Sequence, residues 1–167
     1  MPLKIRREMV DLMVAHARAG DPNEVCGLVA ARTNGDHRDK VATNVYPLRS
    51  TKPSGGFFEI DPLEQIELLD RMHSNGLELG AIYHSHPHIQ PVPSGVDKRY
   101  AENWPGVMWI ILGVSPRWRW KRWNKRTKRL EEVEIEHDED DGPELKVDVW
   151  TWWIEDDRVT TAELIIE

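Results

Sequence analysis

Two histidines and an aspartate stand close together in the middle of the chain. His84 and His86 are separated by one residue, and a short proline-rich stretch leads from them to Asp97. In a β-strand, alternate side chains project to the same face, so both imidazoles would reach one point. Imidazole and carboxylate groups are metal ligands, and three of them leave a position open for water. This spacing constrains the fold, because the segment that carries Asp97 has to return to the strand that carries the histidines.

Two further residues complete a candidate reaction centre. Ser94 and Asp97 are three residues apart at the start of a predicted helix, so they share one face of it. Glu24 lies far upstream, just before a predicted buried strand. With one zinc ion per chain on His84, His86 and Asp97, Glu24 would act as the general base toward the attacking water. Ser94 would donate a hydrogen bond to the oxyanion that develops on the scissile carbonyl.

Each of these residues also has an ordinary structural explanation. Ser94 and Asp97 fit a helix capping box. Glu24 alone fits a loop carboxylate, and His88 is a further candidate ligand. Cys26 is interpreted as a buried structural thiol. A carboxylate that binds zinc has little left for a cap, so we expect Asp97 to serve only one of the two roles.

Composition favours a protein of the cytoplasm and excludes several other classes. The chain has 167 residues, 40% of them hydrophobic and 31% charged, which fits one globular domain. A net charge of −7 argues against general binding to nucleic acid. The longest apolar run, residues 107–114, is too short to cross a membrane. The first residues lack the apolar core of a signal peptide, and a single cysteine excludes an internal disulfide framework.

Hydrophobic periodicity predicts helices interspersed with strands. Helices are expected over residues 3–19, from Pro62 with Asp61 as N-cap, and from Ser94 to near Trp104. Leu63, Ile66, Leu69 and Met72 are expected to form the apolar face of the second helix. Strands are expected over residues 25–31, 41–48, 79–83 and 107–114, with a loop over residues 50–56.

The last third of the chain is rich in tryptophan and charge. Residues 117–129 contain eight Lys or Arg, and residues 131–141 contain eight Asp or Glu. We expect residues 117–137 to form a hairpin whose opposite charges face each other across the strands, followed by an acidic turn or flexible loop over residues 138–143. A second hairpin is expected to pair residues 147–152 with residues 159–166.

The order Glu24, His84-x-His86, seven residues, Ser94, two residues, Asp97 resembles the JAMM signature of the MPN+ (Mov34/PAD-1-like) zinc metallopeptidases. Three more segments resemble family positions: Pro22-x-Glu24-x-Cys26-Gly27-Leu28, Phe58-x-Ile60-Asp61-Pro62 and Tyr83-His84-Ser85-His86-Pro87. The resemblance covers residues 3–115 throughout and residues 116–167 only in part. The short length and Trp104-Pro105-Gly106 resemble the small prokaryotic members.

The resemblance implies one domain over residues 1–167. Its fold would be of the mixed α/β (α+β) class and cytidine-deaminase-like, with a curved, largely antiparallel sheet flanked by helices and an extra C-terminal hairpin. It also implies a zinc-dependent peptidase or isopeptidase that cuts the amide after the C-terminal Gly-Gly of a ubiquitin-like or ThiS/MoaD-type sulfur-carrier protein. The family holds that tail as an added strand. The matching segment here is residues 50–58, with Gly56, Phe57 and Phe58 as substrate-binding residues; an ordinary surface loop is the alternative.

Two other functions remain open for a chain with this pattern. A zinc hydrolase of a small amide or a nucleotide-related substrate would use the same site. A non-catalytic MPN scaffold module belongs to a different class, and such modules typically lack the ligands that this chain retains. Metal analysis separates a scaffold from an enzyme, and a panel of Gly-Gly-tailed substrates separates the two kinds of hydrolase.

Overall fold

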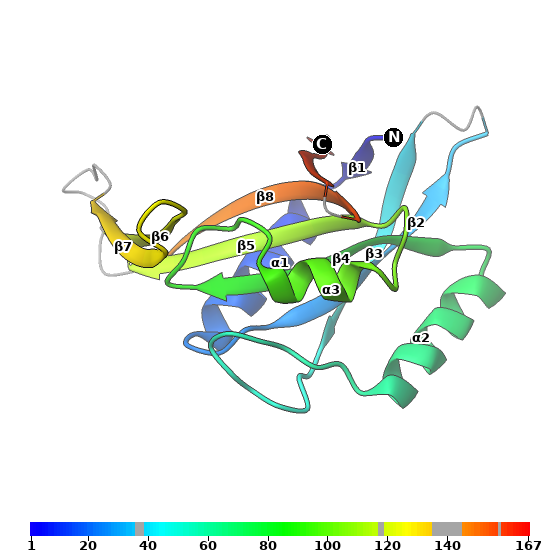
Figure 1. The fold of residues 1–167 in the computed structure, drawn as a ribbon. Helices are drawn as coiled ribbons and strands as arrows, with labels where there is room; N and C mark the ends of the chain where they lie inside the picture. Colours follow the sequence, from blue (N-terminus) through cyan, green and yellow to red (C-terminus); the bar gives the residue numbers. More distant parts are fainter. Residues whose placement is uncertain (36–38, 117–118, 135–144, 157) are drawn as a thin grey trace.

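A mixed sheet of eight strands forms the centre of the fold (Figure 1). The structure is a computed structural model that describes residues 1–35, 39–116, 119–134, 145–156 and 158–167. The strands of this sheet are β1 (Leu3–Ile5), β2 (Cys26–Thr33), β3 (Lys40–Leu48), β4 (Glu78–Pro87), β5 (Met108–Pro116), β8 (Leu145–Glu155), β9 (Arg158–Thr161) and β10 (Leu164–Ile166). A separate two-stranded sheet contains β6 (Arg119–Asn124) and β7 (Arg129–Glu134). The helices are α1 (Arg7–Gly20), α2 (Pro62–Ser74) and α3 (Gly95–Ala101).

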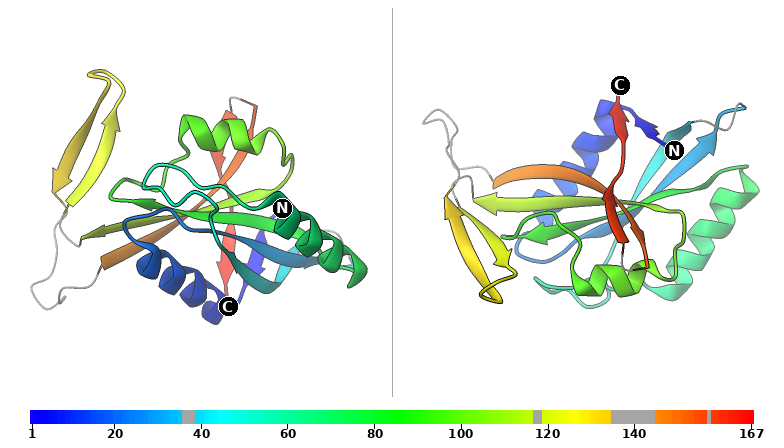
Figure 2. Two further views of the ribbon diagram at one scale, coloured as in Figure 1. Left: turned by 90° about the horizontal axis from the view of Figure 1, so that it is seen from below. Right: turned by 45° about the horizontal axis from the view of Figure 1, so that its top comes forward.

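The strand order across the large sheet is β10-β1-β3-β2-β4-β5-β8-β9. The long strands pair antiparallel, except that β4 and β5 run parallel and are connected through α3. The short β1 runs parallel to both β3 and β10. Figure 2 shows that the sheet is curved, with α1 on one face and α3 on the other. The predicted mixed α/β fold with a curved, largely antiparallel sheet is therefore confirmed.

Side chains of alternate strand residues build two hydrophobic cores, one on each face of the sheet. In β2, Val29 and Ala31 join the core beneath α1, whereas Leu28 and Ala30 join the core beneath α2 and α3. The strands therefore read as nearly continuous apolar runs, as expected for a sheet covered on both faces.

A β-bulge at Gly80 sets which face of the sheet receives the histidines. Ala30 of β2 pairs with Leu79, but the preceding residue, Val29, pairs with Ala81, so Gly80 is the extra residue in β4. Leu79 consequently packs in the core beneath α2, while Ala81, only two residues later, packs in the core beneath α1. An unbroken strand would keep both residues on one face. The bulge thus directs Ile82, His84 and His86 toward α2 and α3.

The first predicted helix begins later than expected. Leu3 and Ile5 belong to β1, and the helix starts only at Arg7. The apolar residues at positions 3 and 5 fit a helix or a strand equally well. The strand is formed because it lies between β3 and β10, where both side chains are buried.

The prediction of which residues form the buried face of the second helix was also partly wrong. Leu63 and Ile66 are 71% and 55% exposed, whereas the predicted Met72 is buried and the predicted Leu69 packs, partly buried, against the core. Leu68, which was not predicted, is buried beside them. The predicted start is correct: Asp61 accepts a hydrogen bond from the Leu63 amide, with Pro62 in the first turn. No helix among the described residues is long and apolar enough to cross a membrane.

The expected charged hairpin is present as β6 and β7, which stand apart from the large sheet in Figure 2. Its register places Lys121 opposite Glu132 and Arg122 opposite Glu131. Residues 117–118 and 135–137, together with the predicted acidic turn, lie outside the described residues. The last expected strand, residues 159–166, is divided: β9 pairs with β8, whereas β10 crosses to β1 and brings the two termini close together (Figure 1).

We predict that Gly80→Ala destabilises the fold. A methyl group at this position would lie 2.6 Å from the Cβ atom of Ala31, a contact that only a backbone shift can relieve. Overpacking of this kind costs about 1–3 kcal/mol, and each 1 kcal/mol lowers Tm by about 2–4 °C in a domain of this size. Thermal unfolding of the purified variant measures the effect. Gly35→Ala is the control, because a methyl group there meets no atom of the described residues within 4 Å. An unchanged Tm for Gly80→Ala would show that the bulge tolerates a side chain.

Candidate metal centre

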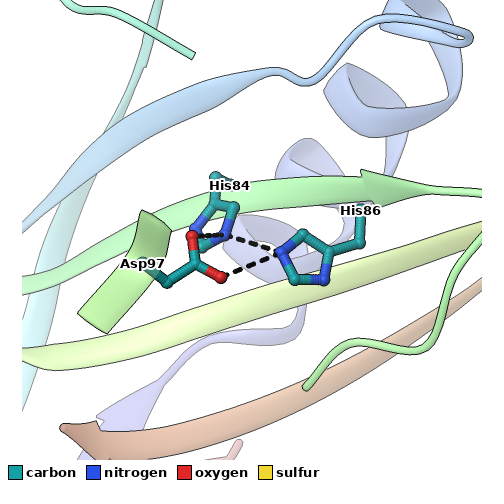
Figure 3. Close-up of side chains that lie close together, drawn as sticks. All are labelled: His84, His86 and Asp97. Carbon is teal, nitrogen blue, oxygen red and sulfur yellow. Dashed lines mark hydrogen bonds and ion pairs between the residues drawn. The ribbon is translucent and has the colours of Figure 1, made fainter. Parts of the chain in front are cut away.

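His84, His86 and Asp97 meet where β4 ends and α3 begins (Figure 3). The Nε2 atoms of the two histidines lie 3.1 Å apart. Asp97 Oδ1 is 2.9 Å from His84 Nε2, and Asp97 Oδ2 is 3.1 Å from His86 Nε2. All three side chains are buried. The strand brings both imidazoles to the same face, and α3 returns the carboxylate to them, as the spacing of these residues predicts.

This cluster fits a single metal ion. Two ligand atoms that each lie 2.0–2.1 Å from an ion at a tetrahedral angle are about 3.3 Å apart. The three observed separations of 2.9–3.1 Å are close to that value, so a small outward movement would admit the ion. Among the described residues, no other three His, Cys, Asp or Glu side chains bring their ligand atoms within 4.8 Å of one another. Three protein ligands leave a position open for water or substrate.

Neighbouring groups fix the orientation of both imidazole rings. His86 Nδ1 lies 3.0 Å from the carbonyl oxygen of Gln90, to which it donates, so that its Nε2 is left free to bind a metal. The His84 ring packs against two aromatic rings, with centroid distances of 4.9 Å to Phe58 and 6.0 Å to Trp109. The sequence did not indicate these supports. Gln90 acts through its backbone carbonyl, and Trp109 reads as an ordinary core residue.

Burial and charge tune the ionisable groups of the cluster. Burial lowers the pKa of His84, which favours the neutral imidazole that binds metals. Burial would raise the pKa of Asp97, but the charges and hydrogen bonds of the two histidines outweigh this effect and hold it well below its usual range. The carboxylate is therefore ionised, as a metal ion requires. Burial opposes the charged form of His86, but its hydrogen bond with Asp97 and the charge of that carboxylate raise the pKa of this imidazole, so that a metal ion would bind there in place of the proton.

The pairing of β2 with β4 brings Glu24 to this cluster from a distant part of the sequence. The amide of Val25 donates to Ser85 Oγ, and the amide of Ser85 donates to the Val25 carbonyl, both at 2.9 Å. Glu24, one residue earlier, is therefore held beside the strand that carries the histidines. Its side chain is buried, and burial raises its pKa to about 8, with smaller opposing effects of His86 and Asp97. A carboxyl group with this pKa can both accept and release a proton near neutral pH.

Ser94 and Asp97 form the capping box at the start of α3, and Asp97 also belongs to the cluster. The Asp97 amide donates to Ser94 Oγ at 3.1 Å, and the Ser94 amide donates to Asp97 Oδ2 at 2.7 Å. Oδ2 accepts the capping bond and also lies beside His86, while Oδ1 faces His84, so the same carboxylate takes part in the cap and in the cluster. The Ser94 hydroxyl hydrogen remains available, since its oxygen acts as an acceptor in the cap.

The structure places the other candidate residues differently. His88 is not part of the cluster: its Nε2 lies 3.0 Å from Asp21 Oδ1. Cys26 is a buried thiol whose pKa is raised to about 12 by burial, as expected of a structural cysteine. Phe58 is buried against His84, so its ring forms a wall of the centre, whereas Gly56 and Phe57 are exposed at the surface.

Comparisons with known proteins agree with this geometry. A family model described as prokaryotic homologs of the JAB domain matches residues 6–124. The desampylase of Haloferax volcanii is 32% identical over 139 residues, which cover 80% of this chain and 96% of the relative. The CysO-cysteine peptidase of Mycobacterium tuberculosis is 32% identical over 112 residues, which cover 67% of this chain and 73% of the relative.

Solved structures share the fold over nearly the whole chain. A solution structure of a protein from Desulfitobacterium hafniense is 28% identical, with a TM-score of 0.70 and coverage of 99% of this chain and 92% of its own. A JAB1/MPN domain protein from Archaeoglobus fulgidus is 15% identical, with a TM-score of 0.51 and coverage of 98% of both chains. The resemblance to the MPN+ proteins is thus confirmed: the chain belongs to the family of prokaryotic JAB-domain proteins and is a hydrolytic enzyme of the JAMM type.

Proposed function

We propose that this chain is a zinc-dependent peptidase or isopeptidase that hydrolyses the amide bond after the C-terminal Gly-Gly of a ubiquitin-like or sulfur-carrier protein. The relatives support this substrate class, because desampylase and CysO-cysteine peptidase cleave conjugates of such proteins. The observation that carries the proposal is the cluster of His84, His86 and Asp97 with the buried Glu24 beside it. A non-catalytic scaffold would have no use for an ionisable carboxyl group at that place.

Each residue of the centre has a distinct part in the proposed reaction. When bound by His84, His86 and Asp97, zinc supplies a Lewis acid that makes water a stronger acid near neutral pH. Glu24 accepts a proton from the attacking water and delivers it to the leaving amine nitrogen. The Ser94 hydroxyl donates a hydrogen bond to the oxygen of the scissile carbonyl as negative charge develops there. Ser94 is well placed for this part, because its cap with Asp97 fixes it beside a ligand.

The segment of residues 50–58 is proposed to bind the Gly-Gly tail. Phe58 anchors the segment against His84, and the amide of Glu24 donates to the Ser54 carbonyl at 2.6 Å. Both contacts place the segment at the edge of the centre. Main-chain groups around Gly56 and Phe57 would pair with the tail as an added strand, and a narrow passage would exclude larger side chains.

We predict one tightly bound zinc ion per chain. The double variant His84→Ala, His86→Ala should lose it, because a single carboxylate is a weak site for zinc. Elemental analysis of the purified proteins measures the zinc content. His73→Ala, which changes an exposed histidine on α2, is the matched control and should retain the ion. Full zinc occupancy in the double variant would place the metal elsewhere.

We predict that Glu24→Gln keeps the fold and the zinc ion but loses nearly all activity. The amide is close in shape to the carboxyl group but cannot accept a proton near neutral pH, and loss of a general base typically costs about 10²- to 10⁴-fold in rate. Turnover of a ubiquitin-like protein extended by a short peptide after Gly-Gly measures the effect. Wild-type turnover in a zinc-loaded Glu24→Gln sample would exclude Glu24 as the base.

We predict that replacing the penultimate Gly of the substrate by Ala lowers kcat/KM at least about tenfold, which corresponds to roughly 1.4 kcal/mol. The site can select a tail without side chains only by excluding larger ones. Gly56→Pro should also reduce cleavage while zinc content is unchanged, because proline removes a backbone donor. Equal cleavage of Gly-Gly and Ala-Ala tails, with full activity of the proline variant, would instead favour the hydrolase of a small amide.

A further inference from the structure

His88 occupies an unusual backbone conformation two residues after the metal-binding His86. Its φ angle is 62°, in the left-handed region that residues other than glycine rarely adopt. The conformation turns the chain at the end of β4 and carries the imidazole toward the segment between α1 and β2. There its Nε2 atom lies 3.0 Å from Asp21 Oδ1. A strained residue is retained only where its surroundings determine its position.

Asp21 lies three residues before Glu24, in the segment that connects α1 to β2. The Asp21 side chain is 18% exposed, whereas that of His88 is 40% exposed. Asp21 Oδ1 is shielded from solvent and accepts no hydrogen bond from a described residue, so its 3.0 Å contact with His88 Nε2 is an ion pair rather than a hydrogen bond. A shielded carboxylate oxygen is costly unless a donor or a cation faces it. The contact with His88 therefore stabilises this position of Asp21.

We propose that His88 and Asp21 form a latch that positions Glu24, and we call this pair the His88–Asp21 latch. The proposal rests on the proposed function, in which Glu24 is the general base. Its two members are positioning residues and do not touch the reacting atoms. The latch ties the segment before Glu24 to the chain that leaves β4, and so to the strand that carries His84 and His86.

The contacts around Glu24 explain why a latch at Asp21 matters. On the C-terminal side, the Val25 amide is bonded to Ser85 Oγ at 2.9 Å. At Glu24 itself, the amide is bonded to Ser54 at 2.6 Å. The latch adds an anchor on the N-terminal side, so that the backbone of Glu24 is held from both directions. A displacement of about 1 Å in a reacting group can cost up to about 10²-fold in rate.

A direct contact between His88 and the substrate is the competing explanation, because the imidazole is partly exposed close to the centre. The two explanations differ in what Asp21 does. If the latch positions Glu24, both partners matter equally, and removing both is no worse than removing one. If His88 instead contacts substrate, Asp21→Asn has little effect, and His88→Asn raises KM.

The test compares Asp21→Asn, His88→Asn and the double variant. Asparagine preserves the shape of Asp21, and at position 88 it tolerates the left-handed conformation but is too short to reach Asp21. Glu8→Gln is the control, because it breaks the exposed ion pair with Arg6 on α1. Hydrogen exchange of the Glu24 and Val25 amides is measured by NMR, zinc content by elemental analysis, and kcat and KM on the Gly-Gly fusion substrate.

The latch predicts faster exchange of the Glu24 amide and a kcat that falls about tenfold in each single variant. KM and zinc content should be unchanged, and the double variant should match the single ones. Wild-type exchange and kcat in both single variants would overturn the proposal, as would a rise in KM confined to His88→Asn. If wild-type protein cleaves no Gly-Gly substrate, the proposed function fails, but the exchange measurement still decides whether the latch holds the segment.

Discussion

The antiparallel pairing of β2 with β4 is the interaction on which the site depends. It sets Cys26 opposite His84 and closes with the two hydrogen bonds between Val25 and Ser85. Glu24 has no sequence neighbour in the centre and reaches it only through this register. A slip by one residue would turn the histidines to the opposite face of the sheet. The bulge at Gly80 fixes the register, so that a glycine outside the centre determines which face of the sheet carries it.

The centre also buries two carboxyl groups close together, an arrangement that a bound cation would stabilise. Asp97 and Glu24 are both buried, and the rings of Phe58 and Trp109 pack against His84 of the same centre. Two carboxylates in such surroundings repel each other, which contributes to the raised pKa of Glu24. A divalent ion held by His84, His86 and Asp97 would compensate this charge and stabilise the folded state by its binding energy. With such an ion bound, the chemistry of the site and the stability of its fold would depend on the same ligand.

The sequence predicted the members of the centre but not its supports. The meeting of His84, His86 and Asp97 in one cluster could be predicted, because a fixed spacing on a strand and a helix start is a local property. The role of the Gln90 carbonyl could not be predicted, since any residue supplies a carbonyl. Leu63 and Ile66 were misassigned because periodicity marks apolar residues and not the face that tertiary packing buries. Residues 3–5 were misassigned because so short an apolar pattern fits a helix as well as a strand between two distant segments.

X-ray absorption spectroscopy of the zinc-loaded protein tests the central claim most directly, because it reports the atoms bound to the metal. A centre built from His84, His86 and Asp97 predicts two imidazole rings and further oxygen ligands, all about 2.0–2.2 Å from zinc, with no sulfur. Removal of His84 and His86 should abolish the imidazole signal. A sulfur neighbour at about 2.3 Å would mean that Cys26 binds the metal. A third imidazole would mean that a histidine such as His88 turns toward it, and either result would contradict the three-ligand centre.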